Sequence, residues 1–182
     1  MKSYKYGIFC LTSSALCIAL CIVLEKFLSI TIGAFRFSIG NLPIIISGLL
    51  FGPIVGAIVG CASDIIGSIL VGYAINPIIT LGAAAVGLTA GLVYNLLAKK
   101  PTSSDYALPK YTPKTIAISV FSAHIVGNII IKSIGLHLYY GYPWPMLLLR
   151  IPLYMVIACI ELMLTYTIFT AIYTLYIKDR SI

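Results

Sequence analysis

Long apolar segments constrain this chain most strongly, because several of them approach the length needed to cross a lipid bilayer. They cover residues 6–24, 53–70, 77–98, 115–134 and 145–177. A helix needs about 20 apolar residues to span a hydrocarbon core of about 30 Å. Of the 182 residues, 60% are hydrophobic and only 9% are charged. We therefore predict an all-α integral membrane protein with a single transmembrane domain over residues 1–182.

A sixth, shorter helix is predicted over residues 42–50, ending at Gly52-Pro53. The alternative is one long kinked span over residues 42–70. Charge favours the first arrangement, because Lys and Arg concentrate in short cytoplasmic loops. With six helices, the cytoplasmic side carries Lys2, Lys5, Lys99, Lys100, Lys110, Lys114, Lys178 and Arg180, and the outer side only Lys26, Arg36, Lys132 and Arg150. Both termini and the polar loop 99–114 are then predicted to be cytoplasmic.

Composition and motifs exclude several classes of function. The net charge of +7 does not indicate a nucleic-acid partner, because the basic residues lie in short loops beside apolar runs. The five cysteines lie in apolar segments without metal-ligand spacing, so we expect no metal site. The sequence has no phosphate-binding loop and no paired nucleophile and base. We expect no catalytic residues, no cofactor and no enzyme activity.

Polar residues at membrane depth are costly and mark candidate sites. On one helix His124, Asn128 and Lys132 are spaced at i, i+4 and i+8 and form a stripe toward the outer surface. On another helix Asp64 continues a stripe of glycines at the same spacing. An outward-facing pocket would bring these residues together with polar helix ends. The candidate substrate-binding residues are Arg36, Asp64, Asn76, His124, Asn128, Lys132 and Arg150. The excess of positive charge suits a ligand that carries carboxylates.

Structural roles compete with ligand binding at several of these positions. Lys132 could snorkel to the interface, Asp64 could pair with an arginine inside the protein, and His124 is expected to be a hydrogen-bonded interior residue. Glu161 is expected to serve packing or a partner contact, and Glu25-Lys26 to be a solvated helix end. The aromatic run 139–144 resembles an interfacial belt and equally a stacking lid over a planar ligand.

Together these segments resemble the substrate-binding, or S, components of energy-coupling-factor (ECF) transporters, in particular the folate branch. The resemblance is densest in Phe35-Arg36-Phe37-Ser38-Ile39-Gly40-Asn41-Leu42-Pro43, in Leu50-Phe51-Gly52-Pro53 with Gly56, Gly60, Asp64 and Gly67, in Asn76-Pro77, in Thr80-Leu81-Gly82, and around Asn128 and Arg150. It implies six helices, an outward-facing high-affinity vitamin pocket and residence in the prokaryotic plasma membrane. It also implies an energising module of one membrane-embedded coupling subunit and two ATPase subunits.

In this family an Ala-xxx-Ala face on the first helix docks the coupling subunit, and Ala15 and Ala19 match it. Small residues let helices approach closely in a membrane, although ordinary intramembrane packing would use the same pattern. The expected ligand is folate or a related vitamin, with Arg36, Lys132 and Arg150 toward its carboxylates and Asp64 toward its pterin donors. The segment 72–77 departs from the commoner family pattern, so another vitamin is the first alternative. A small membrane enzyme or a stand-alone carrier is the second.

Overall fold

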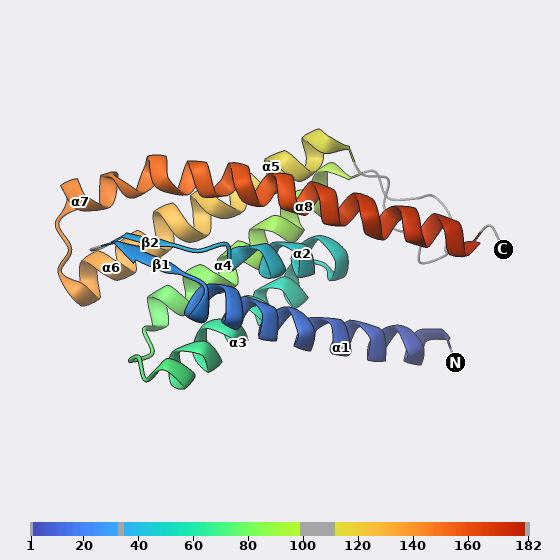
Figure 1. The fold of residues 1–182 in the computed structure, drawn as a ribbon, viewed down its shortest axis with the longest axis horizontal. Helices are drawn as coiled ribbons and strands as arrows, with labels where there is room; N and C mark the ends of the chain where they lie inside the picture. The colour runs from blue at the N-terminus through green and yellow to red at the C-terminus, as the bar shows by residue number, and fades with distance from the viewer. Residues whose placement is uncertain (1, 33–34, 99–111, 181–182) are drawn as a thin grey trace.

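The computed structural model describes residues 2–32, 35–98 and 112–180, and within them the chain forms six helical bodies and one short hairpin (Figure 1). The elements are α1 Lys2–Ile22 with η1 Val23–Phe27, β1 Ile30–Ile32, β2 Phe35–Phe37, α2 Asn41–Phe51, α3 Pro53–Val71, α4 Pro77–Leu97, α5 Pro113–Ala123 with η2 His124–Ile131 and α6 Lys132–Tyr140, and α7 Trp144–Leu148 followed by α8 Arg150–Arg180. The two η elements are π-helical turns.

Five of the helical bodies are long and apolar enough to cross a membrane, and residues 41–51 form a shorter apolar helix. The six predicted helices are confirmed, including the short second helix that stops at Gly52-Pro53. Two differences concern the outer region. The first helix continues to Phe27 rather than ending at Leu24, and an antiparallel hairpin follows in which Ile30 pairs with Phe37.

Helix boundaries follow from local backbone chemistry. Gly52 has a φ of +95°, a left-handed value that glycine adopts without strain, and Pro53 then starts α3 where no backbone N–H is needed. Asn76 caps α4, since its side-chain oxygen accepts hydrogen bonds from the backbone N–H groups of Ile78 and Ile79. These two features fix the turns at the ends of α3.

The helices α2, α3 and α4 pack at very short backbone separations. A Cβ added to Gly56 would lie 2.7 Å from the Gly87 carbonyl oxygen, and one added to Gly60 would overlap the carbonyl of Ala83. Only glycine permits this approach, so the predicted stripe of small residues serves as a packing seam. Buried Val59, Val86 and their neighbours continue the core beside this seam.

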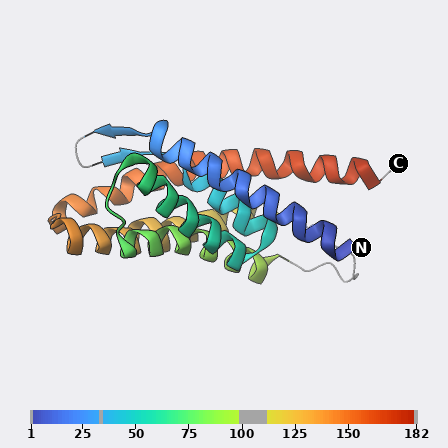
Figure 2. The ribbon, with the colours of Figure 1, turned by 90° about the horizontal axis from the view of Figure 1, so that it is seen from below.

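The N-terminal end of α1 and the C-terminal end of α8 lie at one end of the molecule, whereas the hairpin, α6 and α7 lie at the other (Figures 1 and 2). This is the arrangement expected when both termini share one side of a membrane. Which side is cytoplasmic remains a prediction from the charge distribution. The predicted loop 99–114 falls mainly outside the described residues.

Candidate functional site

A cavity of about 280 Å³ opens near the hairpin end of the bundle, and we call it the main cavity. Its walls come from η1, α3, the turn before α4, α6 and the start of α8. It is lined by Glu25, Lys26, Asp64, Ser68, Tyr73, Ala74, Asn76, Ile79, Lys132, Leu136, Tyr140, Tyr142, Arg150, Leu153 and Tyr154. Its size is near the lower end of the range for small-molecule sites, and it combines apolar walls with a few convergent polar groups.

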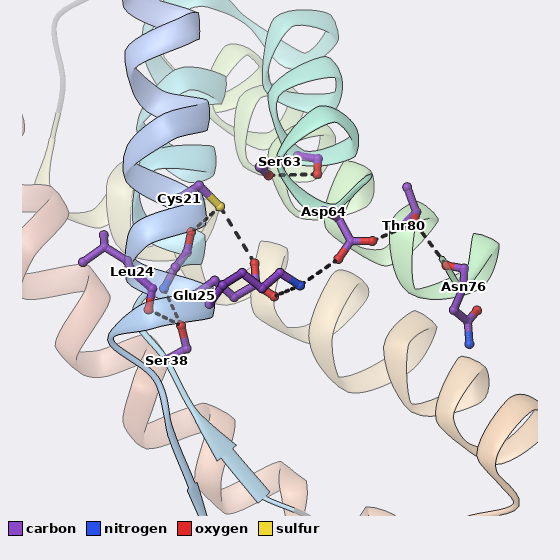
Figure 3. A network of polar contacts seen from close by, with 11 residues as sticks. Cys21, Leu24, Glu25, Ser38, Ser63, Asp64, Asn76 and Thr80 are labelled. Atoms are coloured by element: carbon purple, nitrogen blue, oxygen red, sulfur yellow. Dashed lines mark hydrogen bonds and ion pairs between the residues drawn. The ribbon is translucent and has the colours of Figure 1, made fainter. Parts of the chain in front are cut away.

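Asp64 lies on the floor of the main cavity with both carboxylate oxygens engaged (Figure 3). The Thr80 hydroxyl donates to its Oδ2 at 2.7 Å, and the Lys26 ammonium lies 3.9 Å from its Oδ1. The Asp64 side chain is buried, so these partners offset the cost of removing a charge from water. The internal pair predicted for Asp64 exists, but its cation is a lysine and not an arginine.

Lys26 and Glu25 are not a solvated helix end, and that prediction is wrong. The Lys26 side chain is only 5% exposed, and its ammonium lies 3.7 Å from Glu25 as well as close to Asp64. The π-helical turn η1 extends the first helix and carries both residues into the main cavity. Lys26 is therefore a site residue that sequence reasoning missed. The alternation of Ile30 and Ile32 with polar neighbours could have indicated the hairpin that follows.

Two further cations line the main cavity, Lys132 from α6 and Arg150 from α8. Within residues 2–32, 35–98 and 112–180, no carboxylate oxygen lies within the 4.0 Å of an ion pair from either side chain. The Arg150 guanidinium donates to the Tyr154 hydroxyl at 3.2 Å and lies 5.0 Å from the centre of that ring. Three cations therefore face two carboxylates here, and the surplus positive charge would attract an anion.

The two polar atoms of the Asn76 side chain differ in their hydrogen bonding at the N-terminus of α4. Its side-chain oxygen is used in the helix cap, while its Nδ2 is buried and without a hydrogen-bond partner among the described residues. Because an unpaired buried donor is unfavourable, Nδ2 is suited to a ligand oxygen in the main cavity, which Asn76 lines.

The aromatic run 139–144 divides between two roles. Tyr140 and Tyr142 line the main cavity with ring centres 6.4 Å apart. Tyr139 and Trp144 are exposed, as residues at a membrane interface would be, and Tyr140 is exposed as well as lining the cavity. The Trp144 ring packs on His137 at 4.5 Å, and His137 Nδ1 bonds the Tyr142 carbonyl at 2.9 Å. This contact fixes the turn that carries the two cavity tyrosines.

Not every predicted site residue lines the main cavity. Asp64, Asn76, Lys132 and Arg150 do so, whereas Asn128 lines a smaller neighbouring cavity of about 40 Å³, which we call the side cavity. His124 is fully buried behind them and forms a 2.8 Å pair with Glu161, so its interior role is confirmed. The Arg36 backbone lies in β2 opposite Thr31, but its side chain falls outside the described part of the structure.

The first helix presents an unpartnered face. Ala15 and Ala19 are both exposed on α1, and neither lines the main or the side cavity. Large apolar side chains on the same helix, including Leu16 and Leu20, are exposed as well. A lipid bilayer or a partner helix would cover this surface.

Comparison with known proteins identifies a family that this chain matches. Residues 8–176 match the family described as "ECF-type riboflavin transporter, S component". A 56-residue stretch is 41% identical to the folate transporter FolT of Clostridium novyi (strain NT), and it covers 31% of this chain and 33% of that protein. The matched segment thus spans about a third of the length of this curated relative.

Two solved structures share the fold. The crystal structure of FolT bound with folic acid aligns with a TM-score of 0.68 at 20% identity, covering 86% of this chain and 88% of that one. The structure of the S component of a bacterial ECF transporter aligns with a TM-score of 0.67 at 16% identity, covering 93% and 98%. At these identities the likeness establishes the fold.

Proposed function

The chain belongs to the ECF-type riboflavin transporter S-component family, and from this premise we propose that its own ligand is folate or a closely related vitamin. As a family member it is a multi-pass protein of the prokaryotic cell membrane. The S-component fold and the five candidate spans agree with that location. We infer the substrate from the charged and aromatic residues that line the main cavity.

The unpaired cations of the main cavity carry the proposal. Riboflavin is uncharged at neutral pH, whereas folate carries two carboxylates on its glutamate tail. Lys132 is half-buried and Arg150 is buried, and neither has an ion-pair partner among the described residues, which is unfavourable without an anion. Folate carboxylates would supply that anion through charge-assisted hydrogen bonds. Tyr140 and Tyr142 offer flat surfaces for a pterin ring.

We assign the remaining site residues by their surroundings. Asn76 would donate to a ligand oxygen through its unpaired Nδ2, and Asp64 would accept from a pterin donor while it holds Lys26. Arg36 is proposed as a further cation for the ligand carboxylates, from its charge alone. His124 and Asn128 would support ligand binding from positions behind the main cavity.

We further propose that the chain is not an enzyme and works as one subunit of an importer. A membrane-embedded coupling subunit and two ATPase subunits would energise transport, and Ala15 and Ala19 on the exposed face of α1 would contact the coupling subunit. The single transmembrane domain would then have cytoplasmic termini and a cytoplasmic loop at 99–114. The sequence itself has no phosphate-binding loop.

Ligand-induced thermal stabilisation of the purified chain tests the substrate. A ligand at a hundredfold excess over its Kd stabilises the folded state by about 2.7 kcal/mol, which raises the melting temperature. We expect folic acid to stabilise the protein, its uncharged diamide to stabilise it much less, and riboflavin to have no effect. Stabilisation by riboflavin without stabilisation by folic acid would reassign the ligand to the vitamin in the family description.

A further inference from the structure

We propose that the Asn128 side-chain oxygen accepts a hydrogen bond from an N–H group of the ligand, and that the buried His124–Glu161 pair holds it in that orientation. The inference rests on the proposed function and deepens it, because it names the part of a folate that enters the side cavity. Asn128 would be a specificity-determining residue. His124 and Glu161 would be positioning residues that never touch the ligand.

A chain of hydrogen bonds fixes which end of the Asn128 amide is free. Asn128 Nδ2 lies 3.1 Å from His124 Nδ1, and His124 Nε2 lies 2.8 Å from Glu161 Oε2. An amide nitrogen can only donate, so His124 Nδ1 must accept and the ring proton lies on Nε2. There it faces a carboxylate, which is an acceptor. With a neutral His124 ring and an ionised Glu161, this arrangement matches every hydrogen bond among the three side chains.

These hydrogen bonds leave two buried oxygens unused, Glu161 Oε1 at one end and Asn128 Oδ1 at the end that lines the side cavity. Oδ1 is buried and has no hydrogen-bond partner among the described residues, although Asn128 is fully buried. The π-helical turn η2 carries both His124 and Asn128, and α8 carries Glu161 across from them. Since His124 and Glu161 are also fully buried, water cannot readily replace either partner. An unpaired acceptor held this firmly is suited to a donor from a ligand.

The side cavity gives such a donor a place to enter. It is lined by Glu25, Ser38, Asn41, Asn128, Lys132 and Tyr154, and it shares Glu25, Lys132 and Tyr154 with the main cavity. A volume of about 40 Å³ admits one small polar group and excludes a ring.

The hydroxyl of Ser38, which lines the side cavity with Asn128, is already used. The Ser38 hydroxyl already donates to the Leu24 carbonyl at 3.2 Å and accepts from the Gly40 backbone N–H at 3.0 Å. Ser38 therefore has no hydroxyl hydrogen left for Asn128 Oδ1, which is an acceptor on the wall of the side cavity.

The Asn128 acceptor matches one edge of a pterin ring. The pyrimidine side of a pterin carries an exocyclic 2-amino group beside a ring N–H, so that edge donates hydrogen bonds. In the 2-desamino-2-oxo analogue of folic acid, an oxygen replaces the amino group without a large change in size. That oxygen would face Asn128 Oδ1, and a site built around a polar contact rejects such an analogue strongly.

The test compares the affinities of folic acid and of this 2-oxo analogue for the purified chain by titration calorimetry. For the natural sequence we expect folic acid to bind at least about tenfold more tightly, from the cost of an unmatched buried polar group. The first variant is Asn128→Leu, which removes the acceptor at similar volume. The second is the double substitution His124→Leu with Glu161→Leu, which replaces the buried pair by apolar side chains and so avoids leaving one charge unpaired.

In both variants we expect the ratio of the two affinities to fall to nearly one. In the double variant Asn128 can turn either end of its amide toward the ligand, so affinity for the 2-oxo analogue should be kept or rise. A purely structural role for His124 and Glu161 would weaken both ligands equally and leave the ratio unchanged, which would overturn the positioning role. Equal binding of both ligands by the natural sequence would overturn the proposal while the folate assignment stands. Absence of folic acid binding would overturn both.

Discussion

Replacing Arg150 by alanine should weaken folate binding by about thirtyfold. The Arg150 side chain is buried in the wall of the main cavity, and its guanidinium makes one hydrogen bond within the described residues, to the Tyr154 hydroxyl. A guanidinium has five N–H donors, so most of them are available to a ligand carboxylate. A hydrogen bond between charged groups contributes about 2 kcal/mol, and this corresponds to about thirtyfold in Kd.

Two controls separate this contact from a general disturbance of the site. Tyr154→Phe removes the hydroxyl that Arg150 contacts but keeps the ring, so we expect at most about a threefold loss of affinity. The uncharged diamide of folic acid lacks the proposed partner of Arg150, so its already weaker binding should change little in Arg150→Ala. Titration calorimetry on the purified variants gives these numbers, and the melting temperature without ligand reports on folding.

Two results would refute a contact between Arg150 and a ligand carboxylate. If Arg150→Ala binds folic acid as tightly as the natural sequence does, with an unchanged melting temperature, Arg150 does not contact a carboxylate. An equal loss for folic acid and for the diamide would also contradict the reasoning, because it would mean that the guanidinium shapes the cavity without recognising charge.

Three further variants, one of them with a matched control, test other parts of the structure. Asn76→Asp keeps the oxygen that caps α4 but removes the unpaired Nδ2 donor, so melting should be preserved while folate affinity falls about tenfold; an unchanged affinity would remove Asn76 from the site. Gly60→Ala should lower stability by about 1–3 kcal/mol through overlap with a backbone carbonyl of α4, whereas Gly7→Ala, which meets no atom within 4 Å, should not, as thermal melting will show. Leucine at both Ala15 and Ala19 should leave folate binding intact but abolish co-purification with the energising module and uptake; wild-type uptake would refute the docking face.

The helical framework could be predicted from sequence because membrane solvation leaves few alternatives. Apolar length fixed the long spans, and the Gly52-Pro53 pair together with the charge distribution separated α2 from α3. The spacing of Gly56 and Gly60 with Asp64 indicated both a packing seam and a polar residue at its end. Four of the seven predicted ligand-binding positions line the main cavity. Periodicity is informative about one helix at a time, and these features each lie on one helix.

The pairings between helices could not be predicted in the same way. Lys26 reaches Asp64 from another helix, and His124 reaches Glu161 across 37 positions in the chain. No spacing rule connects residues that far apart, so Lys26 was assigned to solvent and the partner of Glu161 was unknown. The two π-helical turns also escaped prediction, because a single extra residue in a turn leaves little trace in apolar periodicity. These turns carry Lys26, His124 and Asn128 to the site.

The most direct test of the central assignment is a filter assay with radiolabelled folic acid and proteoliposomes that contain the chain alone. On the proposed function, the chain captures its vitamin but depends on partner subunits for transport. We therefore predict saturable binding of one folate per chain, with no dependence on internal vesicle volume and no effect of added ATP. Accumulation that grows with vesicle volume would show that the chain transports by itself, and absence of saturable folate binding would contradict the assignment of its ligand.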